Sequence, residues 1–106
     1  MAKYLFIANY TTQGLKGLFK DGGSKRKEDL GAAIRELGGS LECLYYAFGD
    51  HDVYSIAELP DNVSTAAVSM TINASGAATV KTVVLMAPED IDKATKMTVG
   101  YRPPGQ

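Results

Sequence analysis

The chain contains few of the residues that most often form disulfides or hold metals and cofactors. Its 106 residues include one cysteine, one histidine and no tryptophan. A single cysteine, Cys43, excludes an internal disulfide and suits a reducing compartment. The sequence also has no phosphate-binding loop, no cysteine–histidine zinc spacing and no nucleophile elbow. We therefore expect no cofactor and no metal site.

The chain also lacks an excess of either charge and a long apolar run. Eleven basic and twelve acidic side chains give a formal net charge of −1, without the broad positive field that favours nucleic acid or an anionic membrane. We interpret the short basic run Lys25-Arg26-Lys27 as a solvent-exposed helix face. No apolar stretch approaches the roughly 20 residues of a membrane span, and the first strand begins too near Met1 for a signal peptide. We expect one cytoplasmic domain with no nucleic-acid or membrane partner.

What the sequence does contain is a regular succession of strand and helix patterns. Strand patterns alternate apolar residues with period two, and helix patterns repeat them at three and four residues. The first predicted elements are a strand over 3–10 and a helix that is capped by Thr11 or Thr12, broken near 22–24, capped again by Ser24 and ended by Gly38-Gly39. A β-hairpin over 40–59 follows, with its turn at 49–52. The last elements are a helix from Pro60-Asp61 to about Asn73, closed by Ser75-Gly76, a strand over 78–86 and a short helix opened by Pro88.

This order predicts an α+β fold of the ferredoxin-like type. Strand, helix, strand, strand, helix and strand form a βαββαβ unit, in which two helices cover one face of a four-stranded antiparallel sheet. We assign residues 1–98 to this domain and residues 99–106 to a flexible C-terminal tail.

The strands carry apolar side chains toward both faces of the predicted sheet. In the third predicted element, alternation places Leu41, Cys43, Tyr45 and Ala47 on one side and Leu44, Tyr46 and Phe48 on the other. A sheet face open to water should instead be polar, and a contiguous apolar patch normally meets a partner. We expect the bare face to pair with a second copy as a two-fold homodimer, with larger assemblies left open.

Several short motifs distributed along the chain resemble those of a known family. They are Tyr10-Thr11 with Gly14 and Gly17, Leu37-Gly38-Gly39, the segment 48–53 (FGDHDV), Glu58-Leu59-Pro60-Asp61, and Gly76 before Val80-Lys81-Thr82. Together they cover roughly residues 3–96. The chain is similar to the GYD-domain proteins, small bacterial proteins of the dimeric α+β barrel superfamily.

The resemblance implies a ferredoxin-like subunit and face-to-face pairing of two sheets. It implies no particular activity. One position departs from the pattern, because His51 stands where the family usually has tyrosine, so a role for that tyrosine does not carry over to this chain.

His51 and its neighbours Asp50 and Asp52 are the candidate catalytic residues. Adjacent carboxylates favour the imidazolium and can orient the ring for proton transfer. The structural alternative is that Gly49 and these aspartates simply form the hairpin turn. The same three side chains could approach a divalent ion, but three ligands from one turn are rarely enough.

A group of polar and aromatic side chains on the strands forms the candidate ligand site. If several of them face the space between subunits, they would line an apolar pocket with a few polar tips. Packing in the interface is the structural alternative, because tyrosine combines a large apolar area with a hydroxyl. The candidates are Asn9, Tyr4, Tyr10, Tyr45, Tyr46 and Tyr54.

Three functions are compatible with these features. The first is a small dimeric α+β barrel that binds a small apolar or aromatic ligand between its sheets. The second is a small-molecule enzyme of the monooxygenase, haem-using or isomerase kind found among dimeric α+β barrels, a hypothesis that rests on fold-level analogy. The third is a regulatory or interaction module that recruits a partner through its tail.

Overall fold

The computed structural model describes all 106 residues and contains the predicted elements in the predicted order. The elements are β1 (Ala2–Tyr10), α1 (Thr12–Asp21), α2 (Gly23–Glu36), β2 (Ser40–Tyr46), β3 (Val53–Leu59), α3 (Asn62–Ala74), β4 (Ala78–Leu85) and α4 (Pro88–Thr95).

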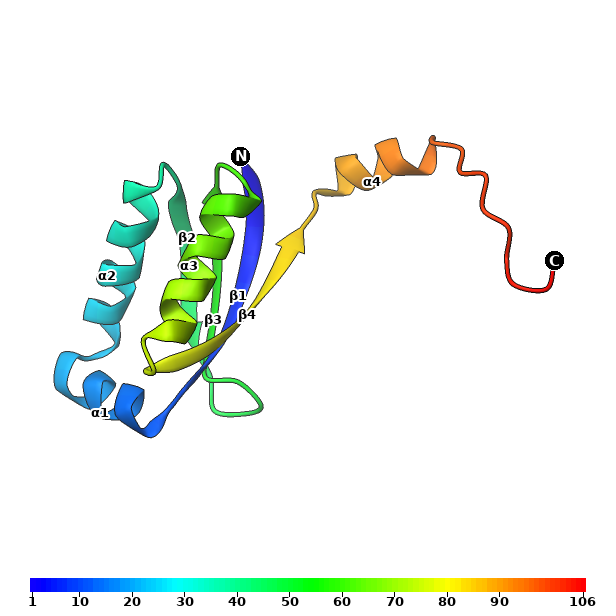
Figure 1. The fold of residues 1–106 in the computed structure, drawn as a ribbon. Helices are drawn as coiled ribbons and strands as arrows, with labels where there is room; N and C mark the ends of the chain where they lie inside the picture. The colour runs from blue at the N-terminus through cyan, green and yellow to red at the C-terminus, as the bar shows by residue number, and fades with distance from the viewer.

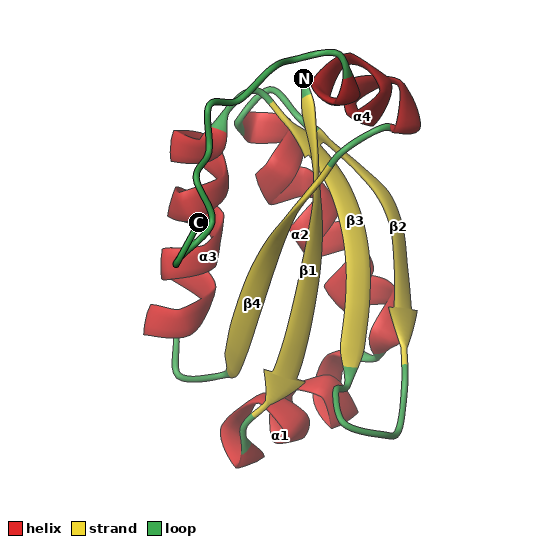
Figure 2. Ribbon diagram, turned by 90° about the vertical axis from the view of Figure 1, so that its right-hand side faces the viewer, coloured by secondary structure: helices red, strands yellow, loops and turns green.

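The four strands form one antiparallel sheet in the order β2-β3-β1-β4. The helices α1, α2 and α3 all lie on one side of this sheet, and the other side is open (Figures 1 and 2). Both helical connections therefore cross the same face, as the ferredoxin-like prediction requires. The α+β, ferredoxin-like prediction is confirmed.

The core lies between β1, β3 and the helices. Alternation along β1 turns Tyr4 and Phe6 toward the helices, where each is at most 3% exposed. The Tyr4 hydroxyl donates to the Asn62 side-chain oxygen at 2.6 Å, which satisfies its polar atom at the start of α3. The other core members are Ile34 of α2, Ala57 and Leu59 of β3, and Val68 of α3.

Two helices begin at capping side chains that the sequence predicted. Thr11 accepts from the Gly14 amide at 3.2 Å and caps α1. Asp61 accepts from the Ser64 amide at 2.8 Å and caps α3, and this hydrogen bond lowers the pKa of the Asp61 carboxyl. Each cap satisfies one of the free N–H groups of a first turn.

The break between α1 and α2 differs from the prediction in one detail. Gly22 has φ +85° and is at once the C-cap of α1 and the N-cap of α2, which has no side-chain cap. The predicted cap by Ser24 is wrong, because a single left-handed glycine makes the whole turn and places Ser24 inside the next helix.

The alternation predicted for β2 is also wrong at Leu41. A bulge lies between Leu41, which pairs with Ala57, and Cys43, which pairs with Ile56. The extra residue shifts the side-chain period, so Leu41 packs against the core while Cys43 faces the open side. Leu44 and Tyr46 face the helices.

The open sheet face has an apolar middle and polar ends. Register and alternation place on it Leu5, Ile7 and Asn9 of β1, Cys43 and Tyr45 of β2, Tyr54 and Ile56 of β3, and Lys81 and Val83 of β4. At one end Lys3 lies 3.0 Å from the Glu42 carboxylate, and this hydrogen bond raises the pKa of Lys3. At the other end lie Asn9 and the β2–β3 loop.

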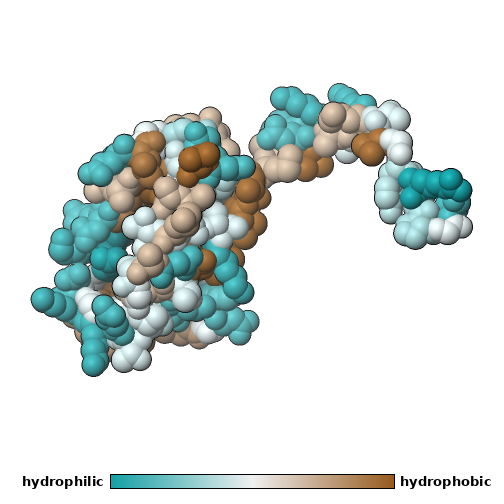
Figure 3. Space-filling model, viewed as in Figure 1, coloured by the Kyte–Doolittle hydropathy of each residue, from teal (hydrophilic) through white to brown (hydrophobic).

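The chain after β4 stands apart from the sheet and helices. We call residues 86–106 the C-terminal arm. It projects on the side of the sheet away from the helices (Figures 1 and 2), and no residue of α4 is buried. Hydrophobic residues gather where β4 runs into the arm and along α4 (Figure 3); Met86, Ile91 and Met97 are about half exposed or more. The flexibility of residues 99–106 stays a prediction.

None of the helices is both long and apolar enough to cross a bilayer.

The start of α1 packs directly on the turn that leads into β4. A Cβ added at Gly14 would lie 1.8 Å from the Ala77 carbonyl oxygen, the same oxygen that accepts from the Thr11 amide at 3.0 Å. The Thr11 hydroxyl donates to the neighbouring Gly76 carbonyl at 2.7 Å. The backbone of this turn therefore cannot move away without losing hydrogen bonds.

We predict that Gly14→Ala lowers the free energy of unfolding by about 1–3 kcal/mol, the usual cost of overpacking a site that cannot relax. Gly17→Ala is the matched control, because nothing lies within 4 Å of the added Cβ. The control should leave stability unchanged or raise it by up to about 1 kcal/mol, since alanine favours the helix. Urea denaturation followed by circular dichroism measures both, and equal stabilities of the two variants would contradict the close contact.

Candidate functional site

His51 folds back from the β2–β3 loop onto the open face of the sheet. Its Nδ1 lies 3.0 Å from the side-chain nitrogen of Asn9. An amide nitrogen donates, so Nδ1 accepts and the proton of the neutral ring is on Nε2. The ring also meets Tyr54 edge-on, with centroids 6.1 Å apart and planes at 79°. Three side chains from β1, β3 and the loop thus form one cluster, which we call the Asn9–His51–Tyr54 cluster.

The two aspartates beside His51 point elsewhere. Asp52 accepts from the Tyr10 amide at 2.9 Å, and its own amide donates to the Ala8 carbonyl at 3.0 Å. It therefore fastens the loop to the end of β1. Asp50 is exposed at the loop tip and makes no hydrogen bond or ion pair. Neither carboxylate is bonded to His51, so the three catalytic candidates do not form one hydrogen-bonded set.

The tyrosines divide between the two faces of the sheet. Tyr45 and Tyr54 are paired neighbours on the open face, beside the cluster. Tyr4, Tyr10 and Tyr46 are on the helix side. Tyr46 donates to the Gly23 carbonyl at 3.1 Å; burial, and then its hydrogen bond with Tyr10, raises the pKa of the Tyr46 hydroxyl to about 12. Only part of the predicted ligand set therefore lies on one surface.

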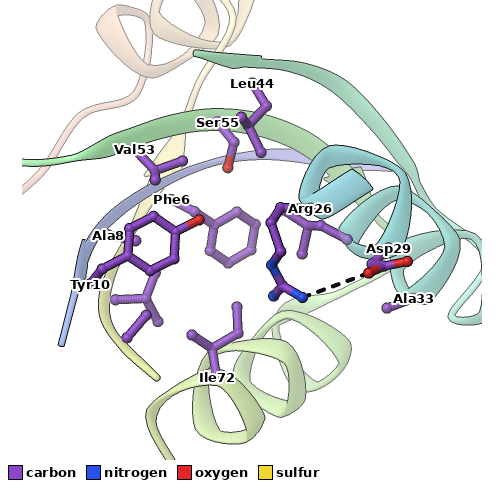
Figure 4. A pocket seen from close by; sticks show the side chains of 13 residues that line it. Phe6, Ala8, Tyr10, Arg26, Asp29, Ala33, Leu44, Val53, Ser55 and Ile72 are labelled. Atoms are coloured by element: carbon purple, nitrogen blue, oxygen red, sulfur yellow. Dashed lines mark ion pairs between the residues drawn. The ribbon is translucent and has the colours of Figure 1, made fainter. Parts of the chain in front are cut away.

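A cavity on the helix side is lined by Tyr10, one of the predicted ligand residues, together with polar residues that were not predicted as site residues. Its volume is about 220 Å³, and ten of its thirteen lining residues are hydrophobic. Arg26 and Asp29 of α2 lie at its edge and form an ion pair at 3.6 Å, and the Ser55 hydroxyl of β3 points toward the Phe6 ring (Figure 4). All three residues of the basic run 25–27 are exposed, as predicted, and Arg26 also borders this cavity.

A signal for the cavity was present in β3. Val53, Ser55, Ala57 and Leu59 all face the helices, and Ser55 and Ala57 are the small members of that row. A serine in a core-facing row leaves space beside it and brings a hydroxyl that needs a partner. The contribution of Arg26 had no such signal, because it depends on how α2 is rotated against the sheet.

The histidine, cysteine and carboxylate groups do not gather anywhere in the structure. No three of them lie close enough to hold a metal ion. The arrangement can instead bind through the free Nε2 of His51, the hydroxyls of Tyr45 and Tyr54, and the apolar middle of the open face.

Comparison with known proteins places the chain in a family. The family model of the GYD domain matches residues 4–95. The chain belongs to the GYD-domain family. The matched span includes the sheet except for the first two residues of β1, the Asn9–His51–Tyr54 cluster and both sides of the helix-side cavity, and it confirms the resemblance seen in the sequence. No curated protein and no solved structure matches the chain.

The loop contacts predict different roles for the two aspartates. Asp52→Ala removes the acceptor of the Tyr10 amide and should lower the free energy of unfolding by about 1.5–3 kcal/mol, as expected for a hydrogen bond to a charged group. Asp50→Ala, two residues away and without a partner, is the control and should change stability by less than about 0.5 kcal/mol. Thermal and urea unfolding measure both; an Asp50→Ala variant as unstable as Asp52→Ala would contradict this assignment.

Proposed function

We propose that this GYD-domain protein is a homodimer that pairs through its open sheet face and binds a small apolar or aromatic ligand between the two sheets. The supporting observation is the uneven character of that face. Leu5, Ile56 and Val83 lie side by side in its middle, and polar side chains occupy both ends. Stable protein interfaces commonly have such an apolar centre and polar rim.

The position of the C-terminal arm supports pairing. It extends on the open side of the sheet and away from its own domain (Figure 1). Its apolar side chains, among them Ile91, Val99 and Tyr101, are exposed in the single chain. A second copy facing the sheet would lie beside this arm and could cover those side chains.

The Asn9–His51–Tyr54 cluster is the proposed recognition element. It lies at one end of the open face, so a second sheet would close over it and exclude water. His51 then offers a fixed Nε2–H donor beside the Tyr54 ring, while the apolar middle holds the body of the ligand. A few oriented polar groups in an apolar site are the usual form of a small-molecule site.

Light scattering on a gel-filtration column tests the pairing. At about 10 µM the wild-type protein should have twice the chain mass of 11.3 kDa. Leu5→Glu places a charge among Ile56 and Val83 and should give a folded monomer, because burying an unpaired charge costs several kcal/mol. Val83→Glu, on the more exposed edge strand, is a second such variant. A monomeric wild-type protein would refute the dimer.

Val63→Glu is the matched control for these variants. Val63 is exposed on α3, on the helix side of the sheet, so the same substitution should leave the dimer intact. Circular dichroism confirms that every variant is folded. If Val63→Glu dissociates the protein and Leu5→Glu does not, the interface lies on the helices and the proposed pairing is wrong.

Native mass spectrometry and a probe titration test the ligand site. Freshly purified dimer should retain a small molecule, and 1-naphthol should bind the dimer by ligand-observed NMR. His51→Phe keeps the ring contact with Tyr54 but removes the Nε2–H donor, so it should weaken naphthol binding about two- to tenfold, the value of one neutral hydrogen bond. Binding that is unchanged in His51→Phe and in the Leu5→Glu monomer would contradict a site between the sheets.

A catalytic role for His51 is the alternative function. Nδ1 accepts from Asn9 and Nε2 carries the free N–H, an arrangement that can direct this N–H at a developing negative charge on a substrate. If the protein is a haem-using enzyme, haem titration should shift the Soret band and His51→Ala should abolish the shift. The absence of a shift with the wild-type protein would rule out a haem-using enzyme.

An interaction module is the third hypothesis. Such a module would lose its protein partner when residues 99–106 are deleted.

A further inference from the structure

The helix-side cavity has the size and lining of a site for one aromatic ring. Its volume of about 220 Å³ exceeds the roughly 150 Å³ that suffices for benzene in an apolar protein cavity. Phe6 and Val80 of the sheet and Leu30 and Ile72 of the helices supply apolar walls.

The closed end of this cavity contains a hydroxyl without a protein partner. Ser55 is only 2% exposed, and its oxygen makes none of the side-chain hydrogen bonds found in the structure. The hydroxyl points into the cavity toward Phe6 (Figure 4). No side-chain nitrogen or oxygen that is sealed from solvent lacks a partner, so the Ser55 oxygen is open to the cavity, where the hydroxyl of a bound molecule can take the place of water as its partner.

The open end of the cavity contains the Arg26–Asp29 ion pair. The Arg26 side chain is 43% exposed and lies between Phe6 and Asp29 (Figure 4). The Asp29 carboxylate lies 3.6 Å from one guanidinium nitrogen of Arg26 and 3.4 Å from the side-chain nitrogen of Lys25. Asp29 thus pairs with two cations, Arg26 of the lining and Lys25 outside it, so Arg26 keeps free guanidinium donors at the cavity mouth. Guanidinium groups pair preferentially with carboxylates in a bidentate manner.

We propose that this cavity binds a single-ring aromatic carboxylic acid that carries a ring hydroxyl. The carboxylate pairs with Arg26 at the mouth, the ring fills the space beside Phe6, and the ring hydroxyl meets Ser55 at the closed end. The ligand class follows from this order of charge, apolar volume and hydroxyl along the cavity.

This site is separate from the one between the sheets. Ser55 and Arg26 are on the helix side, and the proposed dimer covers the opposite face. The Leu5→Glu monomer should therefore bind the acid as well as the dimer does. A monomeric wild-type protein would therefore not contradict this site, and a lack of binding at this site would not contradict the dimer.

Three probes dissect the site by calorimetry or by shifts in amide NMR signals. 4-Hydroxybenzoate carries both polar groups, benzoate lacks the hydroxyl, and phenol lacks the carboxylate. The wild-type protein should bind 4-hydroxybenzoate most tightly and each of the other two more weakly. Amide shifts should map to α2, α3 and the middle of β3.

Two substitutions should each act on one end of the ligand. Arg26→Gln should weaken 4-hydroxybenzoate and benzoate about tenfold or more and leave phenol unchanged, because it removes a charged hydrogen bond. Lys27→Gln, the next residue on α2, removes a charge that does not border the cavity and is its control. Ser55→Ala should weaken 4-hydroxybenzoate about two- to tenfold and leave benzoate unchanged.

A third substitution blocks the cavity without touching its polar groups. Ala33→Leu adds bulk to the lining from an exposed position of α2, and Ala32→Leu adds the same bulk outside it. Binding should be lost in Ala33→Leu and kept in Ala32→Leu. The proposal is overturned if no probe binds at about 10 mM, if Ala33→Leu binds like the wild-type protein, or if Arg26→Gln and Ser55→Ala do not separate the three probes as stated.

Discussion

The structure depends on a single constraint: three helices cover one face of a four-stranded sheet, and no helix of the chain covers the other face. β1 lies in the interior of the sheet, between β3 and β4, so its alternate side chains build both surfaces. Tyr4 and Phe6 enter the core, while Leu5 and Ile7 on the opposite side stay without cover from this chain. Burial of apolar area is the main favourable term in folding and in most association. The same strand therefore stabilises the subunit and creates the apolar middle of its open face.

The two candidate binding sites follow from the two faces of that sheet. On the open face, the β2–β3 loop turns back so that His51 meets Asn9 at the end of β1. On the helix side, small residues of β3 leave room beneath α2, and Arg26 comes to the mouth of the space. Each site combines an apolar surface with a few oriented polar groups, and neither contains a metal cluster. Binding, with or without catalysis, is the chemistry that both arrangements have in common.

The deviations from sequence expectation come from the backbone rather than from the pattern of residue types. Ser24 is a good capping residue, yet Gly22 makes both helix ends with one positive φ, and Ser24 falls inside α2. Leu41 obeys the alternation of its neighbours in sequence, yet one extra residue in β2 moves it to the core. Caps and bulges shift by a single residue at small energetic cost, so local propensity does not fix them. Asp52 and Asp50 are alike in sequence, but only Asp52 reaches the amide of Tyr10.

By itself, the sequence determined the order of the elements, the ferredoxin-like sheet, the family and the apolar character of both sheet faces. These properties depend on periodicity, on capping residues such as Thr11 and Asp61, and on motifs spread over the whole domain, all of which are local in sequence. Only the tertiary structure decided that His51 faces the open sheet beside Asn9 and Tyr54, that the tyrosines divide between two faces, and that Ser55 and Arg26 border one cavity. Asn9 and His51 are 42 positions apart in the sequence. Such groupings depend on strand register and on the rotation of α2 against the sheet, which no local pattern specifies.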